Sequence, residues 1–200
     1  MCGIAGIMTR DGSAPPAGVL DALAVALAHR GPDGHGRHVD GDVGLVQTRL
    51  AIIDLETGDQ PIAAKGPDGN EAVLVANGEI YNYVEVKLDL GRVPFKTRSD
   101  CEVPLQLYLR EELGFTDHLR GMYAIAIHDR ARGRLVLTRD PFGIKPLYFT
   151  QSGSAFAFAS EPQALIRAGL ATARLNPMAR DEMLQMQFSS GRETPFAGIE

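Results

Sequence analysis

The 200-residue sequence has no tryptophan and only two cysteines, Cys2 and Cys101. Two cysteines do not make a disulfide framework, so we expect both to be free thiols in a reducing compartment. Basic residues are not in excess either: 20 lysines and arginines stand against 25 acidic residues, for a net charge of -5. This balance argues against a nucleic-acid-binding surface.

Long apolar runs are also missing. The longest, such as VLDALAVALA and YAIAI, are too short to span a membrane, and the N-terminus has neither a basic segment nor a cleavage site. We therefore expect a cytoplasmic protein with no membrane association. Hydrophobic residues make up 44% of the chain, which is enough to bury the core of one substantial domain.

Apolar periodicity and turn residues predict both strands and helices. The expected strands are 2–8, 43–55, 71–80, 122–129, 134–140, 147–150 and 155–160. Residues 56–70 are expected to form one long loop. Helices are expected from Pro16 to the HRGPDG segment and over 98–114, and two more are expected to begin near Ser160 and Asn176.

Side chains at the helix starts predict how these helices are capped. Ser99 with Glu102, and Ser160 with Gln163, have the three-residue spacing of a capping box. Asn176 precedes a proline, which is the pattern of an N-cap followed by proline at the first helical position. Each of these residues therefore predicts where a helix begins.

The order of the elements favours an α+β fold. Two mainly antiparallel sheets packed face to face, with helices outside, would bury the apolar faces of both kinds of element. This arrangement is a four-layer αββα sandwich. The pattern alone also permits an open α+β sheet.

Cys2 directly follows the initiator Met1. We expect Met1 to be removed because the cysteine side chain is small, which would leave the thiol beside its own α-amine. An α-amine titrates at roughly 7.7 to 8.0, so it can accept and return a proton at neutral pH. A thiol with such a base needs no histidine or aspartate partner. The alternative is a half-buried thiol that acts as a small hydrophobic residue.

Asn77 and Gly78 follow an apolar run and are expected at the end of a strand. A side-chain amide and a glycine N–H that point to one place can form an oxyanion hole. An Asn-Gly hairpin turn explains the same pair.

Two charged residues could bind the ends of an amino acid. Arg49 could hold a carboxylate with two hydrogen bonds, or it could lie on the surface. Asp100 is expected in the first turn of a helix, where a carboxylate is favoured with or without a ligand. With a nucleophile and an oxyanion hole, these residues suit attack on the side-chain amide of a free amino acid.

No metal site is expected from the sequence. His35 and His38 have a metal-like spacing, but they lie in a glycine-rich segment with no cysteine or carboxylate ligand set expected around them. Cys101 lies between two carboxylates, Asp100 and Glu102, which disfavour a thiolate. We therefore expect Cys101 to be structural.

Seven segments occur in the order and approximate spacing of a known family: MCGIAGI, HRGPDG, RLAIIDL, NGEIYNY, SDCE, RGMYAIAIHD and RDPFGIKPLYF. In them the chain resembles the glutaminase domain of class II glutamine amidotransferases, and especially the branch of the glutamine-hydrolysing asparagine synthetases. The resemblance covers nearly the whole chain. The departures are mild: Tyr123 and His128 replace residues at aromatic positions of the usual pattern.

The resemblance implies an N-terminal nucleophile hydrolase fold, with Cys2 as the nucleophile and Asn77 and Gly78 as the oxyanion hole. It implies that Arg49 and the backbone of the following residues hold the glutamine carboxylate, while acidic residues meet its amino group. The implied glutamine-binding residues are Arg49, Leu50, Ile52, Ile53, Asn77, Gly78, Glu79 and Asp100. No metal or organic cofactor is implied for this reaction.

The resemblance further implies a glutaminase domain over residues 2–187 and the start of a linker over 188–200. The expected reaction converts L-glutamine to L-glutamate and ammonia. Ammonia would then pass to a C-terminal synthetase domain that uses ATP and Mg²⁺, and whose Ser-Gly-Gly loop is absent from this sequence. A homodimer stays open as the assembly state.

Two other interpretations stay open. The chain could be the glutaminase domain of a different amidotransferase, such as one that makes glucosamine phosphate or phosphoribosylamine. It could also bind glutamine, or dock on a partner, without turnover. A retained Met1 would favour this last interpretation because it blocks the amine.

Overall fold

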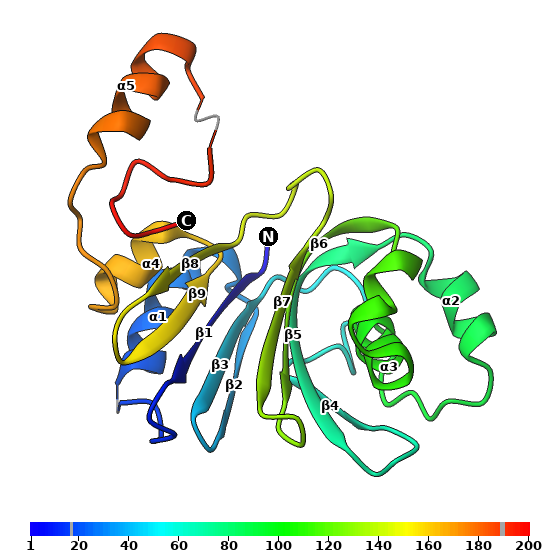
Figure 1. Cartoon of the computed structure of the whole chain (residues 1–200). Helices are drawn as coiled ribbons and strands as arrows, with labels where there is room; N and C mark the ends of the chain where they lie inside the picture. Colours follow the sequence, from blue (N-terminus) through cyan, green and yellow to red (C-terminus); the bar gives the residue numbers. More distant parts are fainter. Residues whose placement is uncertain (17, 189–190) are drawn as a thin grey trace.

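The computed structural model of the protein describes residues 1–16, 18–188 and 191–200, which form two β-sheets with helices outside them (Figure 1). The first sheet has the strand order β2-β3-β1-β9-β8. Its strands are β1 (Gly3–Thr9), β2 (Gly34–Asp40), β3 (Val43–Arg49), β8 (Tyr148–Gln151) and β9 (Ala155–Ala159). The second sheet has the order β4-β5-β6-β7, with β4 (Ile62–Lys65), β5 (Glu71–Ile80), β6 (Gly121–Asp129) and β7 (Arg134–Arg139). The strand pairs of both sheets are antiparallel.

Helices cover the outer face of each sheet (Figure 1). The first sheet is covered by α1 (Val19–Leu27), which continues into the short 3₁₀-helix η1 (Ala28–Arg30), and by α4 (Pro162–Arg167). The second is covered by α2 (Tyr83–Leu90), α3 (Glu102–Glu111) and the 3₁₀-helix η2 (Glu112–His118). The last helix, α5 (Pro177–Met186), projects at one end of the molecule beyond α4.

Three apolar layers hold this arrangement together. One lies between the sheets, and the other two lie between each sheet and its helices. Alternation along each strand produces them, because successive side chains point to opposite faces. The layer between the sheets contains Ile4, Val43, Leu45, Val75, Ala124, Ala126 and Phe158. The predicted four-layer αββα sandwich is therefore confirmed.

Three elements were missed by the sequence prediction, namely β2, β4 and α2. Strand β2 has the sequence GHGRHVD and lies at the edge of its sheet, so it does not show the apolar alternation of a central strand. Strand β4 lies within the expected long loop 56–70. The predicted strand 43–55 is too long, because β3 ends at Arg49 and the following residues form a loop.

Two of the three predicted caps are wrong. Cys101, not Ser99, is the N-cap residue of α3, and Glu102 accepts backbone N–H groups from Lys96 and Thr97. Ser160 accepts the N–H of Ile4 at 3.0 Å instead of capping α4.

The third cap is confirmed, because the side chain of Asn176 accepts hydrogen bonds from the N–H groups of Met178 and Ala179. Local spacing failed at Ser160 because a distant backbone N–H takes its hydroxyl oxygen. Ser99 lies two residues before the N-cap and accepts the N–H of Cys101 at 3.1 Å.

The C-terminal segment packs back on the first sheet. Glu200 and Phe149 exchange two backbone hydrogen bonds beside β8, and Ile199 is buried. The predicted linker 188–200 includes residues 189 and 190, which lie outside the described residues, and the boundary at 187 stays a prediction. In the part of the chain that the structure describes, no helix has the length and apolarity needed to cross a membrane.

Candidate active site

A small pocket lies where the two sheets meet near the N-terminus. Its volume is about 110 Å³. On the side of the first sheet it is lined by the residues before β1, by β3 and by the loop after β3, and on the side of the second sheet by β5 and β6. All nine residues predicted for the site line it: Cys2, Arg49, Leu50, Ile52, Ile53, Asn77, Gly78, Glu79 and Asp100. The structure thus brings together residues that lie up to 98 positions apart in the sequence.

Cys2 stands at the pocket wall, directly before β1. Its Sγ is 3.4 Å from the backbone nitrogen of Leu50 and 3.6 Å from the carbonyl oxygen of the same residue. Arg30 donates a hydrogen bond from Nε to the Cys2 carbonyl at 3.0 Å and pairs with Glu161 at 2.8 Å. The backbone of Cys2 is therefore fixed, while its half-exposed thiol faces the pocket.

Asn77 and Gly78 lie within β5, not at its end or in a hairpin turn as the sequence allowed. They pair with Ala124 and Tyr123 of β6. Gly78 is required by close packing, since an added Cβ would lie 2.4 Å from the carbonyl oxygen of Met122. The Asn77 side chain is 2% exposed, and its Nδ2 has no hydrogen-bond partner among the described residues.

The backbone N–H of Gly78 is available at the edge of β5 that borders the pocket. Alternate residues of a strand direct their N–H groups to the same edge. On either side of Gly78, the N–H of Ala76 donates to Gln60 Oε1 at 2.6 Å and that of Ile80 donates to Asp100 Oδ2 at 2.7 Å. The N–H of Gly78 faces the same edge between them, so it can reach a ligand in the pocket.

Arg49 is buried and already holds a carboxylate. Its Nη1 lies 2.6 Å from Oδ1 of Asp59, whose side chain is 83% exposed. Its Nη2 donates to the carbonyl groups of Ile53 and Asp54, which fixes the loop after β3 around the guanidinium. A ligand carboxylate can take the place of Asp59, because an exposed side chain rotates away at little cost.

Asp100 is buried and precedes α3. The prediction that it lies in the first turn of the helix is therefore wrong. The Ile80 N–H donates to its Oδ2 at 2.7 Å, and the Ser99 hydroxyl lies 3.4 Å from its Oδ1. Glu79 lines the same pocket from β5. Two carboxylates thus line the same pocket as Asn77 and Gly78, where they can bind a ligand ammonium.

Cys101 also lines the pocket, but its surroundings disfavour the thiolate form. Burial, followed by the negative charge of Asp100, raises the pKa of the Cys101 thiol well above its ordinary value. The sequence prediction was that carboxylates would disfavour its thiolate. The structure adds that burial is the larger cause.

Gln47 is a pocket residue that the sequence prediction missed. It lies on β3 and is 1% exposed, yet neither its Nε2 nor its Oε1 has a hydrogen-bond partner among the described residues. A buried amide without a partner is costly, so it marks a place where a ligand supplies the missing bonds. The sequence signal was a single polar residue within the apolar strand VGLVQTR.

Comparison with known proteins identifies relatives of this chain. A family model described as a glutamine amidotransferase domain matches residues 1–200. Asparagine synthetase [glutamine-hydrolyzing] 2 of Bacillus subtilis is 44% identical over 82% of this chain and 22% of its own length. Asparagine synthetase [glutamine-hydrolyzing] 1 of the same organism is 38% identical over 84% of this chain and 27% of its own length. The chain thus spans about a quarter of the length of these relatives.

Solved structures show the same fold. Glutamine phosphoribosylpyrophosphate amidotransferase of B. subtilis superposes with a TM-score of 0.69, at 23% identity, over 84% of this chain and 44% of its own. A structure described as the allosteric regulatory enzyme of purine biosynthesis has a TM-score of 0.72 at the same identity and covers 43% of that chain. At this identity the likeness concerns the fold alone.

Proposed function

This chain belongs to the glutamine amidotransferase domain family, and on that premise we propose that its pocket hydrolyses L-glutamine to L-glutamate and ammonia. The observation that carries the proposal is the meeting of Cys2 from the first sheet with Asn77 and Gly78 from the second. The pocket also offers a cation for the substrate carboxylate and carboxylates for its ammonium.

In the proposed reaction the Cys2 thiolate adds to the side-chain amide carbon of glutamine. The Asn77 Nδ2 and the Gly78 N–H hold the oxyanion that forms. The carbon–nitrogen bond then breaks as the α-ammonium of Cys2 gives its proton to the departing ammonia, which leaves a glutamyl thioester. The α-amine next takes a proton from water, which attacks the thioester and releases glutamate.

Removal of Met1 is part of the proposal. Met1 lines the pocket, and its Sδ lies 3.8 Å from Lys145 Nζ. Its loss would free the α-amine of Cys2 and vacate space for the substrate. The intact mass of the purified protein measures whether Met1 has been removed.

The direct test is glutamate release by the full 200-residue chain, measured with L-glutamine and with D-glutamine. We expect release from the L isomer alone, because the carboxylate and ammonium sites are fixed relative to Cys2. A chain with an uncleaved extension before Cys2 is the matched control, and it should lose at least about 100-fold in rate because its base is blocked. Equal rates with and without the extension would contradict the proposed role of the amine.

The pair of Arg49 and Asp59 gives a second prediction. Arg49→Ala should raise the KM for glutamine at least about 30-fold, because a buried charge that binds the substrate carboxylate is lost. Alkylation of Cys2 should continue. Asp59→Asn should lower the KM about two- to fivefold, because it removes an exposed competitor for the same guanidinium.

Steady-state kinetics and thermal melts check both variants. The melts show whether Arg49→Ala also unfolds the loop after β3. If folded Arg49→Ala protein has an unchanged KM, Arg49 does not bind the substrate carboxylate.

We further propose that the ammonia is used by a synthetase domain that binds ATP and Mg²⁺ and lies outside this chain. The proposal is supported by the curated relatives, which are named asparagine synthetases and are about three to four times as long. The acceptor would then be aspartate. Amide formation by a longer natural chain that contains these 200 residues, given glutamine, ATP and Mg²⁺, is the measurement that tests it.

A further inference from the structure

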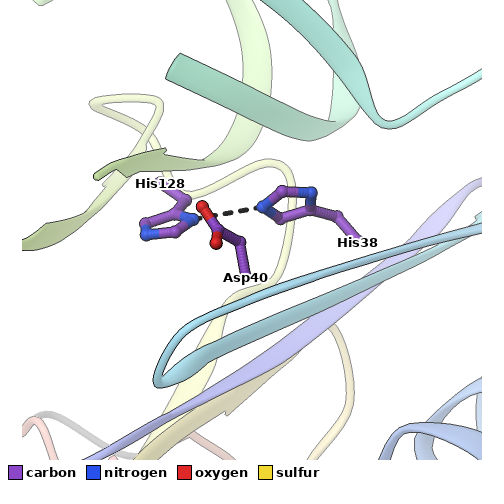
Figure 2. Close-up of side chains that lie close together, drawn as sticks. All are labelled: His38, Asp40 and His128. Atoms are coloured by element: carbon purple, nitrogen blue, oxygen red, sulfur yellow. Dashed lines mark hydrogen bonds between the residues drawn. The ribbon is translucent and has the colours of Figure 1, made fainter. Parts of the chain in front are cut away.

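A second cluster of reactive side chains lies at the other end of the sandwich. His38 and Asp40 come from β2 in the first sheet, and His128 comes from β6 in the second (Figure 2). One ligand atom from each residue lies within 4.8 Å of the other two. His38 Nε2 and His128 Nδ1 are 3.2 Å apart and share a hydrogen bond.

The strand geometry points these three side chains inward. His38 and Asp40 are two residues apart on β2, so they share a face, and they pair with Leu45 and Val43. Both partners belong to the apolar layer between the sheets. His128 follows Ala124 and Ala126 at alternate positions of β6, so it also points into this layer.

We propose that His38, Asp40 and His128 bind one zinc ion that links the two sheets. Two imidazoles and one carboxylate are a donor set that suits Zn²⁺, whereas Mg²⁺ and Ca²⁺ prefer oxygen ligands. Two nitrogen ligands of a tetrahedral zinc ion lie about 3.3 Å apart, given zinc–nitrogen distances of about 2.0 Å. The 3.2 Å between the two ring nitrogens already matches this spacing.

The surroundings of the cluster favour a cation. Besides Asp40, three carboxylates bring negative charge to the imidazoles. Asp42 and Asp129 interact electrostatically with His128, and Glu71 interacts with His38. His128 is 4% exposed.

One cation competes with zinc for the same carboxylate. Arg130 Nη1 lies 3.0 Å from Asp40 Oδ1, and 75% of the Arg130 side chain is exposed. An exposed ion pair is weak, so Asp40 can exchange Arg130 for the metal. Removal of Arg130 should therefore tighten zinc binding.

His35 and His38 have a metal-like spacing in the sequence, but no metal site was expected there. His35 and His38 are three residues apart on a strand, so their side chains point to opposite faces and cannot share an ion. His35 is exposed on the other face of β2 and is the matched control for His38.

Zinc binding is tested on the full chain in a Cys2→Ala background, because an N-terminal cysteine can itself bind zinc. Isothermal titration with ZnCl₂ should show one saturable site per chain, and thermal melts should show a raised Tm. Co²⁺ should give the visible absorption of a tetrahedral ion without a thiolate charge-transfer band. Absence of saturable binding would overturn the proposal.

Variants locate the site. His38→Ala and His128→Phe should each weaken zinc binding at least about 100-fold, whereas His35→Ala should leave it unchanged. Arg130→Gln should tighten it about two- to fivefold. Melts without zinc show that each variant folds. Retained binding in either ligand variant, or an equal loss in His35→Ala, would overturn the assignment.

Discussion

Cys2→Ala should abolish glutamate release from L-glutamine, with a loss of at least about 10⁴-fold in kcat/KM. The variant keeps the pocket but removes the atom that would form the thioester. Among the described residues, the Cys2 thiol lies within hydrogen-bond distance only of the backbone of Leu50, so the fold should tolerate its loss. Rates of glutamate formation and a thermal melt measure the two effects separately.

Cys101→Ala is the matched control, because Cys101 lines the same pocket. Its thiol is buried and has a raised pKa, so it is a poor nucleophile. We expect less than about a tenfold loss of activity, with some loss of stability from the small cavity. If the Cys101→Ala protein is folded but inactive while the Cys2→Ala protein is active, the nucleophile is Cys101 and not Cys2.

Asn77→Leu should lower kcat about 10²- to 10³-fold and change KM little. The Asn77 amide is proposed to meet the oxyanion, which exists only after attack by Cys2. Leucine has a similar volume, so the packing of β5 should persist. Because Nδ2 is buried without a partner among the described residues, its removal should leave the Tm unchanged or raise it.

Gln60→Leu is the control for Asn77→Leu, because it also replaces a buried side-chain amide of the pocket by an apolar group. Gln60 lines the same pocket, but its Oε1 accepts the Ala76 N–H at 2.6 Å. Its replacement should lower the Tm because a buried donor loses its partner. If Asn77→Leu lowers the Tm as much as Gln60→Leu while kcat stays high, Asn77 is a structural residue and not part of the oxyanion hole.

The sequence predicted which residues lie together in the candidate site, whereas their roles stay predictions. Cys2, Arg49, Asn77 and Asp100 lie in short segments whose residue types are tied to chemistry, and all of them line one pocket. Gln47 was missed because one buried glutamine in an apolar strand has no local signature. Only the packing of β3 against the second sheet places its amide in the pocket.

The fold prediction failed where tertiary contacts decide. Strand β2 has few apolar residues because it lies at an edge, and its pairing with β3 makes it a strand. The apolar residues after Arg49 suggested a longer strand, but Ile52 is exposed and lines the pocket. Ser160 accepts the backbone N–H of Ile4 from the far end of the sequence and so does not cap α4. Such partners are invisible to local spacing.

The position of β1 sets the order in which a nascent chain can become active. β1 precedes all other strands of the described residues in the sequence, yet it lies between β3 and β9, and Ala5 pairs with both Val46 and Ala159. Residues up to Ala159 must therefore be synthesised before the strand that follows Cys2 has both neighbours. The framework that holds Cys2 is incomplete until then, so the proposed reaction would begin only when translation of the domain is nearly finished.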